Sequence, residues 1–284
     1  MKARQDAAAA ALRGYLGAAL LSVLLAVPCT ATALELPYKV GIAGTADEDL
    51  LAALRNNSLL IAEEDRPPPT EAALRRRAEA DLQHLDAVLD SFGYYAGTIA
   101  YEIDPDATPA RVELRVEAGP QYRLVAYNVT GPSPALSDGS VRVTEDDLGV
   151  SPGQPAEAAP IVASQARLLA AFARQAYPLA RITDQNIVVD HADNSVTVNL
   201  KVDLGPRALF GTVTIDGLET VKREFVAARL PWAEGAPYDG SLVDQARQSL
   251  RETGLFTTVS VVPGNAVDED GNLPVAVEVT EAKH

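Results

Sequence analysis

Cysteine and methionine are almost absent from this sequence, which has one of each, Cys29 and Met1, in 284 residues. Neither occurs after residue 33, so the rest of the chain can form neither a disulfide nor a thiolate–metal site. Aromatic residues are also few, at 5% of the chain. The fold must therefore be stabilised by packing, without covalent or metal cross-links.

Basic residues are outnumbered, because 24 Lys and Arg stand against 39 Asp and Glu and give a net charge of −15. Nucleic acid and anionic lipid repel such a chain, so we expect neither as a partner. The acidic groups at 63–65 and 268–270 lie in segments rich in Pro, Gly and Asn. We interpret them as solvated loops, since the second group lacks the remaining ligands of a calcium loop.

Long apolar runs are missing. The longest, residues 15–27, is short of the roughly 20 residues that cross a bilayer. Basic residues precede it and the small residues Ala31, Thr32 and Ala33 follow it. This pattern predicts a secretory signal peptide, residues 1–33, cleaved after Ala33. The segment carries three basic residues and one acidic residue, so its removal takes the net charge from −15 to −17.

What the sequence does contain is a repeat. Gly44, Gly131 and Gly217 each close a strand-like run, at intervals of 87 and 86 residues. Gly-Pro pairs begin at Gly119 and Gly205, each twelve residues before the closing glycine. The spacing predicts three copies of one structural unit of about 80 residues, with the three closing glycines as structural turn residues.

Each copy is predicted to consist of a strand, two helices and a hairpin. The first strands are expected at 38–42, 122–129 and 209–215, and the hairpins at 94–117, 181–202 and 256–279. The last strand of each hairpin alternates apolar and polar residues, which indicates one covered and one solvated face. We therefore predict an α+β fold of three β-α-α-β-β domains, at residues 34–118, 119–204 and 205–284. Each would be a three-stranded mixed sheet covered on one face by two helices.

Helix starts are predicted from capping residues. Thr45 and Glu48 resemble a capping box, as do Thr144 and Asp147, and Thr70 begins a longer helix. That longer helix has apolar residues at three- and four-residue steps, which is typical of a face packed on a sheet. Further helices are expected from residues 160, 220 and about 242.

This order of elements, with a glycine closing the first strand, resembles the polypeptide-transport-associated (POTRA) domain. Three copies after a signal peptide, with the sequences 210–217 (FGTVTIDG) and 254–256 (GLF), are similar to the periplasmic arm of the TamA family of outer-membrane protein insertases. The resemblance covers residues 38–281. It implies a protein-binding arm in the periplasm that serves outer-membrane protein and autotransporter assembly.

The resemblance also implies partners: a TamB-like inner-membrane protein, unfolded outer-membrane protein or autotransporter clients, and a C-terminal barrel if a longer reading frame exists. In the family fold the first hairpin strand lies at the sheet edge, where a partner segment can add as a further strand. Here that strand corresponds to residues 94–101, 181–189 and 256–262. We expect Tyr94, Ala96, Thr98 and Ala100 to lie along the docking edge.

Two other classes remain as alternatives. A stand-alone periplasmic or cell-envelope POTRA scaffold without insertase activity would have the same fold. A carboxylate-based hydrolase is disfavoured, because abundant acidic residues are not by themselves a site. The three histidines, His84, His191 and His284, have no partner at ligand spacing, and no nucleophile elbow, P-loop or dinucleotide motif occurs. We therefore predict no enzyme activity, no cofactor, no metal and no small-molecule substrate.

Overall fold

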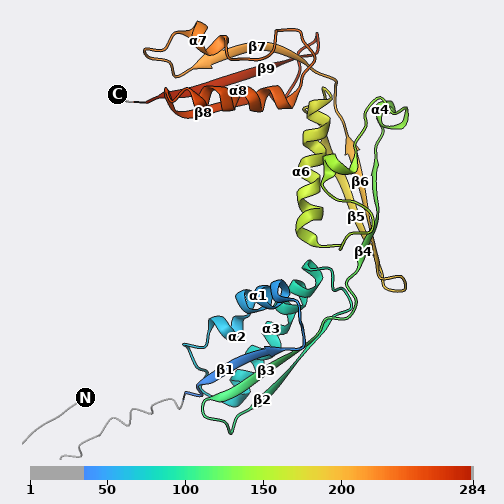
Figure 1. Cartoon of the computed structure of the whole chain (residues 1–284), viewed down its shortest axis with the longest axis vertical. Coiled ribbons are helices and arrows are strands. Elements are labelled where there is room, and N and C mark those ends of the chain that lie inside the picture. The colour runs from blue at the N-terminus through green and yellow to red at the C-terminus, as the bar shows by residue number, and fades with distance from the viewer. Residues whose placement is uncertain (1–34, 283–284) are drawn as a thin grey trace, which may run out of the picture. The chain divides into compact units, whose positions relative to one another are not determined.

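The computed structural model describes residues 35–282, which form three mixed sheets with helices (Figure 1). The predicted signal peptide, residues 1–33, lies outside the described residues. The elements of the first repeat are β1 (Tyr38–Ala43), α1 (Glu48–Asn57), α2 (Leu59–Ala62), α3 (Glu71–Ser91), β2 (Thr98–Asp104) and β3 (Ala110–Glu117). Those of the second are β4 (Arg123–Thr130), α4 (Pro134–Ser137), α5 (Glu145–Leu148), α6 (Ala158–Arg174), β5 (Arg181–Asp190) and β6 (Ser195–Asp203). Those of the third are β7 (Leu209–Asp216), α7 (Arg223–Ala227), α8 (Gly240–Glu252), β8 (Phe256–Pro263) and β9 (Asn272–Glu281).

All three sheets have the same topology. The strand orders are β1-β3-β2, β4-β6-β5 and β7-β9-β8, so the last strand of each repeat is central. In every sheet the first strand pairs parallel to the central strand and the other hairpin strand pairs antiparallel to it. The predicted α+β architecture of three mixed three-stranded sheets is confirmed.

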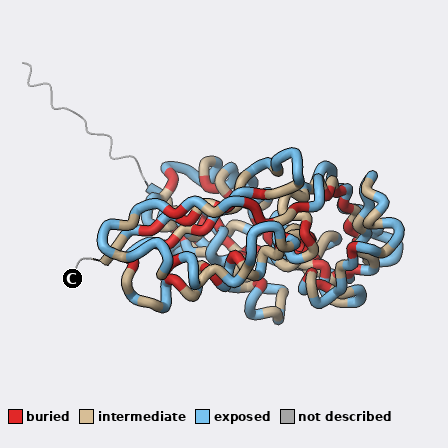
Figure 2. Tube along the Cα trace, turned by 90° about the horizontal axis from the view of Figure 1, so that it is seen from above, coloured by how far each residue is buried: buried red, intermediate tan, exposed pale blue. Residues whose placement is uncertain are grey.

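Each repeat has its own hydrophobic core, formed by buried residues of its strands and helices. Buried and exposed stretches alternate along the chain (Figure 2). The central strands alternate between buried and exposed positions, as in β3, where Val112, Leu114 and Val116 are at most 2% exposed. The opposite face of this sheet carries charged residues such as Arg115, which pairs with Glu102. The alternation along the central strand therefore gives the sheet one buried face and one solvent-exposed face, as the sequence pattern predicts.

The helix caps agree with the prediction at two of three positions. Thr70 accepts a hydrogen bond from the Ala73 N–H at the start of α3, and Thr144 with Asp147 forms a complete capping box at α5. The predicted box of Thr45 and Glu48 is wrong, because Asp47 caps α1 by accepting from the Leu50 N–H. Asp and Thr are both favourable N-caps, so the sequence does not decide between neighbouring candidates.

Several element boundaries also differ from the prediction. The first hairpin strand begins at Thr98 rather than residue 94, because residues 94–97 form a turn that ends in a hydrogen bond from Gly97 to Tyr94. The helix predicted from residue 220 begins at Arg223 and is only five residues long. The four-residue helix α2 is not predicted, since it depends on the buried carboxylate of Asp81 more than on its own sequence.

The three closing glycines lie where the first strand passes closest to the central strand. A Cβ atom on Gly44, Gly131 or Gly217 would overlap the carbonyl oxygen of Val116, Val202 or Val279, respectively. Gly44 and Gly217 also have positive φ angles, of 103° and 86°. Glycine at these positions allows the close approach that larger residues prevent.

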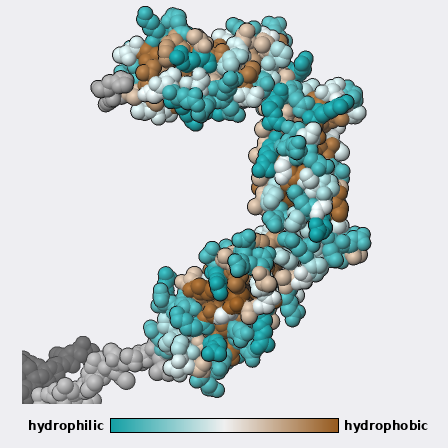
Figure 3. Space-filling model, viewed as in Figure 1, coloured by the Kyte–Doolittle hydropathy of each residue, from teal (hydrophilic) through white to brown (hydrophobic). Residues whose placement is uncertain are grey.

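The visible surface is mostly hydrophilic, with small hydrophobic patches within the repeats (Figure 3). The large apolar side chains that are clearly exposed are Leu59, Val125, Val162, Ile187, Val188 and Val262. Among residues 35–282, no helix combines the length and hydrophobicity required to cross a membrane.

Candidate functional site: the sheet edges

Every sheet has two edge strands, and the backbone groups of the two differ in their hydrogen bonding. One edge is the outer side of the first strand, β1, β4 or β7, which we call the first-strand edge. The other is the outer side of the first hairpin strand, β2, β5 or β8, which we call the hairpin edge. Unpaired backbone groups on such edges can bind an extended segment of another protein. Which groups are free therefore decides where a partner could add.

A proline-containing loop closes the beginning of the first-strand edge in the second and third repeats. In β4, the Leu124 N–H donates to the Gln154 carbonyl at 2.9 Å, and its carbonyl accepts from Gly153 at 2.6 Å. In β7, the Phe210 N–H and carbonyl make the same two bonds, at 2.8 and 2.7 Å, to loop residues 236 and 235. The two loops share the sequence Gly-x-Pro, at 153–155 and 235–237. Backbone pairing within the repeat thus occupies these positions.

In the first repeat, a carboxylate occupies one backbone group of the first-strand edge. Glu64 accepts the Val40 N–H at 3.0 Å and pairs with the Lys39 ammonium at 2.6 Å. Burial would raise the pKa of Glu64, but the hydrogen bonds from Lys39 and Val40 and the Lys39 charge lower it overall. Upstream of the strand, the Leu36 N–H donates to Pro68. The edge of β1 therefore has its own internal partner.

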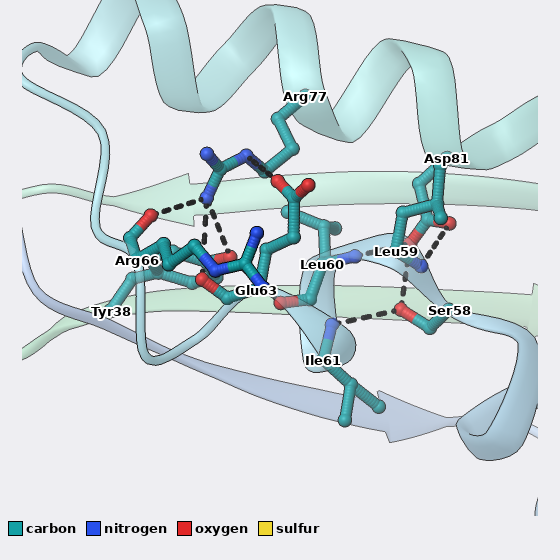
Figure 4. Close-up of polar contacts among 9 residues, drawn as sticks. All are labelled: Tyr38, Ser58, Leu59, Leu60, Ile61, Glu63, Arg66, Arg77 and Asp81. Carbon is teal, nitrogen blue, oxygen red and sulfur yellow. Dashed lines mark hydrogen bonds and ion pairs between the residues drawn. The ribbon is translucent and has the colours of Figure 1, made fainter.

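The loop that carries Glu64 is itself fixed by α3, as Figure 4 shows. The guanidinium of Arg77 pairs with Glu63 at 2.8 Å and donates to the Arg66 carbonyl at 3.0 Å. It also donates to the Tyr38 hydroxyl at 3.1 Å, and that hydroxyl donates to Leu60. These bonds hold the loop, and with it Glu64, beside β1.

In the third repeat, an arginine closes the rest of the first-strand edge. The Arg223 guanidinium donates to the carbonyls of Val213 at 3.1 Å and of Ile215 at 3.3 Å. Arg223 is the first residue of α7, directly after the N-cap Lys222. Its side chain takes the place that an added strand would use.

The outward-facing groups of the hairpin edge follow from strand geometry. Backbone groups of successive residues point alternately to the two sides of a strand. The backbone groups of Val40 point away from β3, because the Val40 N–H bonds Glu64. The backbone groups of its register partner on β3, Val112, therefore point toward β1. Ile103, which lies opposite Val112 on β2, then has its backbone groups on the outer side of the sheet. By alternation, Ile99 and Tyr101 also face outward. The corresponding residues of β5, from the same register, are Gln185, Ile187 and Val189.

The hairpin edge of the third repeat is partly blocked. Val261 has the register position of Tyr101, and its carbonyl accepts a hydrogen bond from Arg247 of α8 at 2.8 Å. Two residues later, Pro263 occupies an outward position and has no N–H to donate. An arginine and a proline thus protect β8 against strand addition.

The hairpin edges of β2 and β5 lack such protection within the part of the chain that the structure describes. No hydrogen bond reaches the outward backbone groups of either strand there. In β5, Ile187 and Val188 are 40% and 46% exposed, so apolar side chains lie on an open edge. These two strands are the candidate docking sites.

The four predicted docking residues fall into two groups. Thr98 and Ala100 lie in β2 with exposed side chains, while Tyr94 and Ala96 precede the strand. The Tyr94 hydroxyl donates to Asp47 at 3.1 Å. Burial, together with the Asp47 carboxylate, raises the pKa of Tyr94. By the alternation above, the backbone of Thr98 and Ala100 faces β3, so the outward residues Ile99, Tyr101 and Ile103 were missed. The side chains of these three residues pack against the core, so the sequence pattern gives no sign that their backbone groups face outward.

Side chains that bind metal ions do not form a cluster in residues 35–282. No group of three or more His, Cys, Asp or Glu residues there has the geometry of a metal site. His84 lies on the exposed side of α3, and His191 lies in the β5–β6 turn, where its Nδ1 atom is 2.8 Å from the Tyr122 hydroxyl.

Comparison with known proteins agrees with the fold. Residues 208–282 match the POTRA family, described as a surface antigen variable number repeat. The crystal structure of POTRA domains 3–5 of Haemophilus influenzae BamA is similar, with a TM-score of 0.53 and 19% identity over 87% of this chain and 96% of that chain.

Two further structures show weaker likeness. BamA from Haemophilus ducreyi lacking POTRA domains 1–3 has a TM-score of 0.47 and 18% identity, over 57% of this chain and 30% of that one. The N-terminal domain of Omp85 from Thermosynechococcus elongatus has a TM-score of 0.34 and 18% identity, over 87% and 97%. The assignment rests on the first structure and on the family match: the described chain has the fold of tandem POTRA domains, and its third repeat also matches POTRA in sequence.

Proposed function

We propose that this chain is the periplasmic, protein-binding arm of an outer-membrane protein assembly factor of the TamA type. It comprises three POTRA domains at residues 34–118, 119–204 and 205–284. Its partners would be unfolded outer-membrane or autotransporter polypeptides and a TamB-like inner-membrane protein, and any attachment to the outer membrane would come from a barrel. The POTRA fold and the predicted signal peptide support this proposal.

The observation that carries the binding role is the unequal protection of the edges. Glu64 accepts the Val40 N–H on β1, Arg223 donates to two carbonyls of β7, and Arg247 and Pro263 block β8. In contrast, no hydrogen bond within the described residues reaches the outward backbone groups of β2 and β5. A protein under selection only for solubility would protect all its edges. Leaving two of the three hairpin edges open suits a binder of extended polypeptides, because backbone bonds give affinity with little sequence demand.

Amide hydrogen exchange tests strand addition at β2 directly. The probe is a ten-residue peptide that alternates Val or Tyr with Thr or Lys, added to the full chain. The outward N–H groups of Ile99, Tyr101 and Ile103 should become protected on binding. Those of Ala100 and Glu102 should change little, because they already bond β3. Equal protection of all five amides, or of none, would contradict the proposal.

A pair of variants separates backbone pairing from side-chain packing. Tyr101→Pro and Tyr101→Val both remove the phenol and its bond to Glu79, but only the proline lacks the outward N–H. We expect the proline variant to bind the peptide at least about fivefold more weakly than the valine variant, the value of one hydrogen bond. Ile187→Pro and Ile187→Val provide the same comparison on β5. Equal affinities in both pairs would exclude backbone docking.

A further inference from the structure

A row of asparagines crosses the second sheet and ends at β5. Asn128 of β4, Asn199 of β6 and Asn186 of β5 lie opposite one another in register. The Asn128 Nδ2 donates to the Asn199 Oδ1 at 2.9 Å, and the Asn199 Nδ2 donates to the Asn186 carbonyl at 3.4 Å. Within residues 35–282, no hydrogen bond reaches the side-chain amide of Asn186, an exposed residue. The row therefore stops at an open edge with one amide unpaired.

The residues beside Asn186 continue an uncharged pattern. Gln185, on the core side of the sheet, accepts a hydrogen bond at its Oε1 from the Gln165 Nε2 of α6 at 3.0 Å. Because successive residues of a strand lie on opposite faces, β5 presents one amide on each face here. The next two residues, Ile187 and Val188, are both exposed and also lie one on each face. This edge thus offers two amides followed by two aliphatic side chains, without a charge among them.

The other open edge, β2, presents charged groups at the same positions. The register with the central strands places Tyr101 and Glu102 where β5 has its two amides. On the core side, the Tyr101 hydroxyl donates to the Glu79 carboxylate at 3.1 Å. On the other face, Glu102 pairs with Arg115 at 2.7 Å. The two open edges therefore differ in the side chains that they suit.

We infer that the segment that adds to β5 carries an asparagine or glutamine opposite Asn186, next to aliphatic residues opposite Ile187 and Val188. This specificity rests on the proposed function and defines the class of client that the second repeat takes. The incoming amide extends the row to a fourth strand, since amide side chains in register hydrogen-bond along such a ladder. The aliphatic residues cover exposed apolar surface on both faces of the sheet.

An amide fits this place better than a carboxylate or an aliphatic residue. The Asn186 side chain has both a donor and an acceptor, and another amide supplies the complement of both. An ionised carboxylate can only accept, and the net charge of −15 on the chain repels it. An aliphatic side chain would leave the Asn186 amide without a partner.

Three peptides test this specificity on the full chain. The first is N-acetyl Thr-Thr-Val-Val-Asn-Thr-Thr amide, which can run antiparallel to β5 with its asparagine opposite Asn186. The second has leucine, which is similar in shape, in place of asparagine, and the third has threonine in place of both valines. Amide exchange at Ile187 and Val189 reports strand addition, and NMR titration gives the affinities. We expect the third peptide to bind about threefold more weakly than the first.

The decisive quantity is the ratio of the affinities of the asparagine and leucine peptides. We expect this ratio to fall about threefold in the Asn186→Leu variant, the value of one cross-strand pair. Asn128→Leu, the same change at the far end of the row, is the matched control and should leave the ratio near that of the parent. Circular dichroism verifies that each variant is folded.

The possible outcomes distinguish this specificity from strand addition itself. Protection of the Ile187 and Val189 amides with a ratio that does not respond to Asn186→Leu would overturn the inference and leave strand addition intact. Equal binding of the first and third peptides would overturn the aliphatic part of the match. No protection with any of the peptides would overturn strand addition at β5, and the inference with it.

Discussion

Asp81 is a fully buried carboxylate on α3, and it holds the beginning of α2 in place (Figure 4). It accepts hydrogen bonds from the Ser58 hydroxyl at 2.7 Å and from the N–H groups of Leu59 and Leu60 at 2.7 and 3.2 Å. These donors form the beginning of α2. A long helix thus holds a short one that could not form alone.

Asp81→Ala should therefore lower the free energy of unfolding of the first repeat by about 3 kcal/mol or more, because several buried donors lose their acceptor. Urea denaturation monitored through amide exchange of the first repeat would measure the loss. Asp86→Ala, an exposed change on the same helix, is the matched control and should cost less than about 0.5 kcal/mol. Similar losses in the two variants would show that the buried bonds contribute little.

Glu281 performs a comparable task on the surface of the third repeat. Its carboxylate accepts the N–H groups of Glu219, Thr220 and Val221 at 2.8–3.1 Å and the Thr220 hydroxyl at 2.5 Å. These hydrogen bonds, with that of the Thr220 hydroxyl the strongest, lower the pKa of Glu281 from 4.5 to about 2. The carboxylate joins the end of β9 to the segment before α7.

This lowered pKa gives a prediction with a definite sign. A depressed carboxyl pKa stabilises the folded state above about pH 4.5, and the stabilisation is lost as the pH falls toward about 2. Glu281→Gln should therefore unfold at lower denaturant concentration than the parent at pH 6, and the gap should narrow steadily between pH 4.5 and pH 2. A gap that stays constant over this range would mean that ionisation of Glu281 is not its cause.

At the level of strands, β8 offers a test of edge protection. The double variant Arg247→Gln, Pro263→Val frees the Val261 carbonyl from the guanidinium and restores an N–H donor at residue 263. We expect the double variant to associate in a concentration-dependent manner, because an unprotected edge pairs with other strands. Sedimentation velocity at several concentrations measures this association. Arg247→Gln alone, which keeps the proline, should stay closer to the parent, and a monomeric double variant would refute the protective role.

The sequence predicts strands and long helices well, but it does not predict how the edges are protected. Alternation in residues 112–116 and the stripe on residues 74–92 depend on local periodicity, which a single sequence displays. Glu64, Arg223 and Arg247 protect edges through contacts with strands 8 to 24 residues away. Nothing in the local pattern distinguishes them from ordinary solvated charges. The predicted start of β2 at residue 94 is wrong for a different reason: Tyr94 and Tyr95 have a high strand propensity but lie in a turn.

Across the whole chain, the three repeats share one plan and differ in which polar residues lie at the edges. The buried residues of each core come from one repeat, as the central positions Leu114, Leu200 and Val277 illustrate. On the first strands, a carboxylate accepts one backbone N–H in the first repeat and a guanidinium donates to two backbone carbonyls in the third. Repeats with similar cores therefore expose different backbone groups at their edges.

Separate cores imply that damage to one repeat stays local. Leu200 is fully buried in the central strand of the second repeat, so Leu200→Ala should destabilise that repeat by about 2–5 kcal/mol. Amide exchange should accelerate in β4, β5 and β6 and stay near parent values in β3 and β9. Leu114→Ala is the matched change in the first repeat. It should accelerate amide exchange in β1, β2 and β3 and leave β6 and β9 near parent values. If either variant accelerated exchange equally in all three sheets, the repeats would form one cooperative unit, and binding at one edge could then influence the others through stability alone.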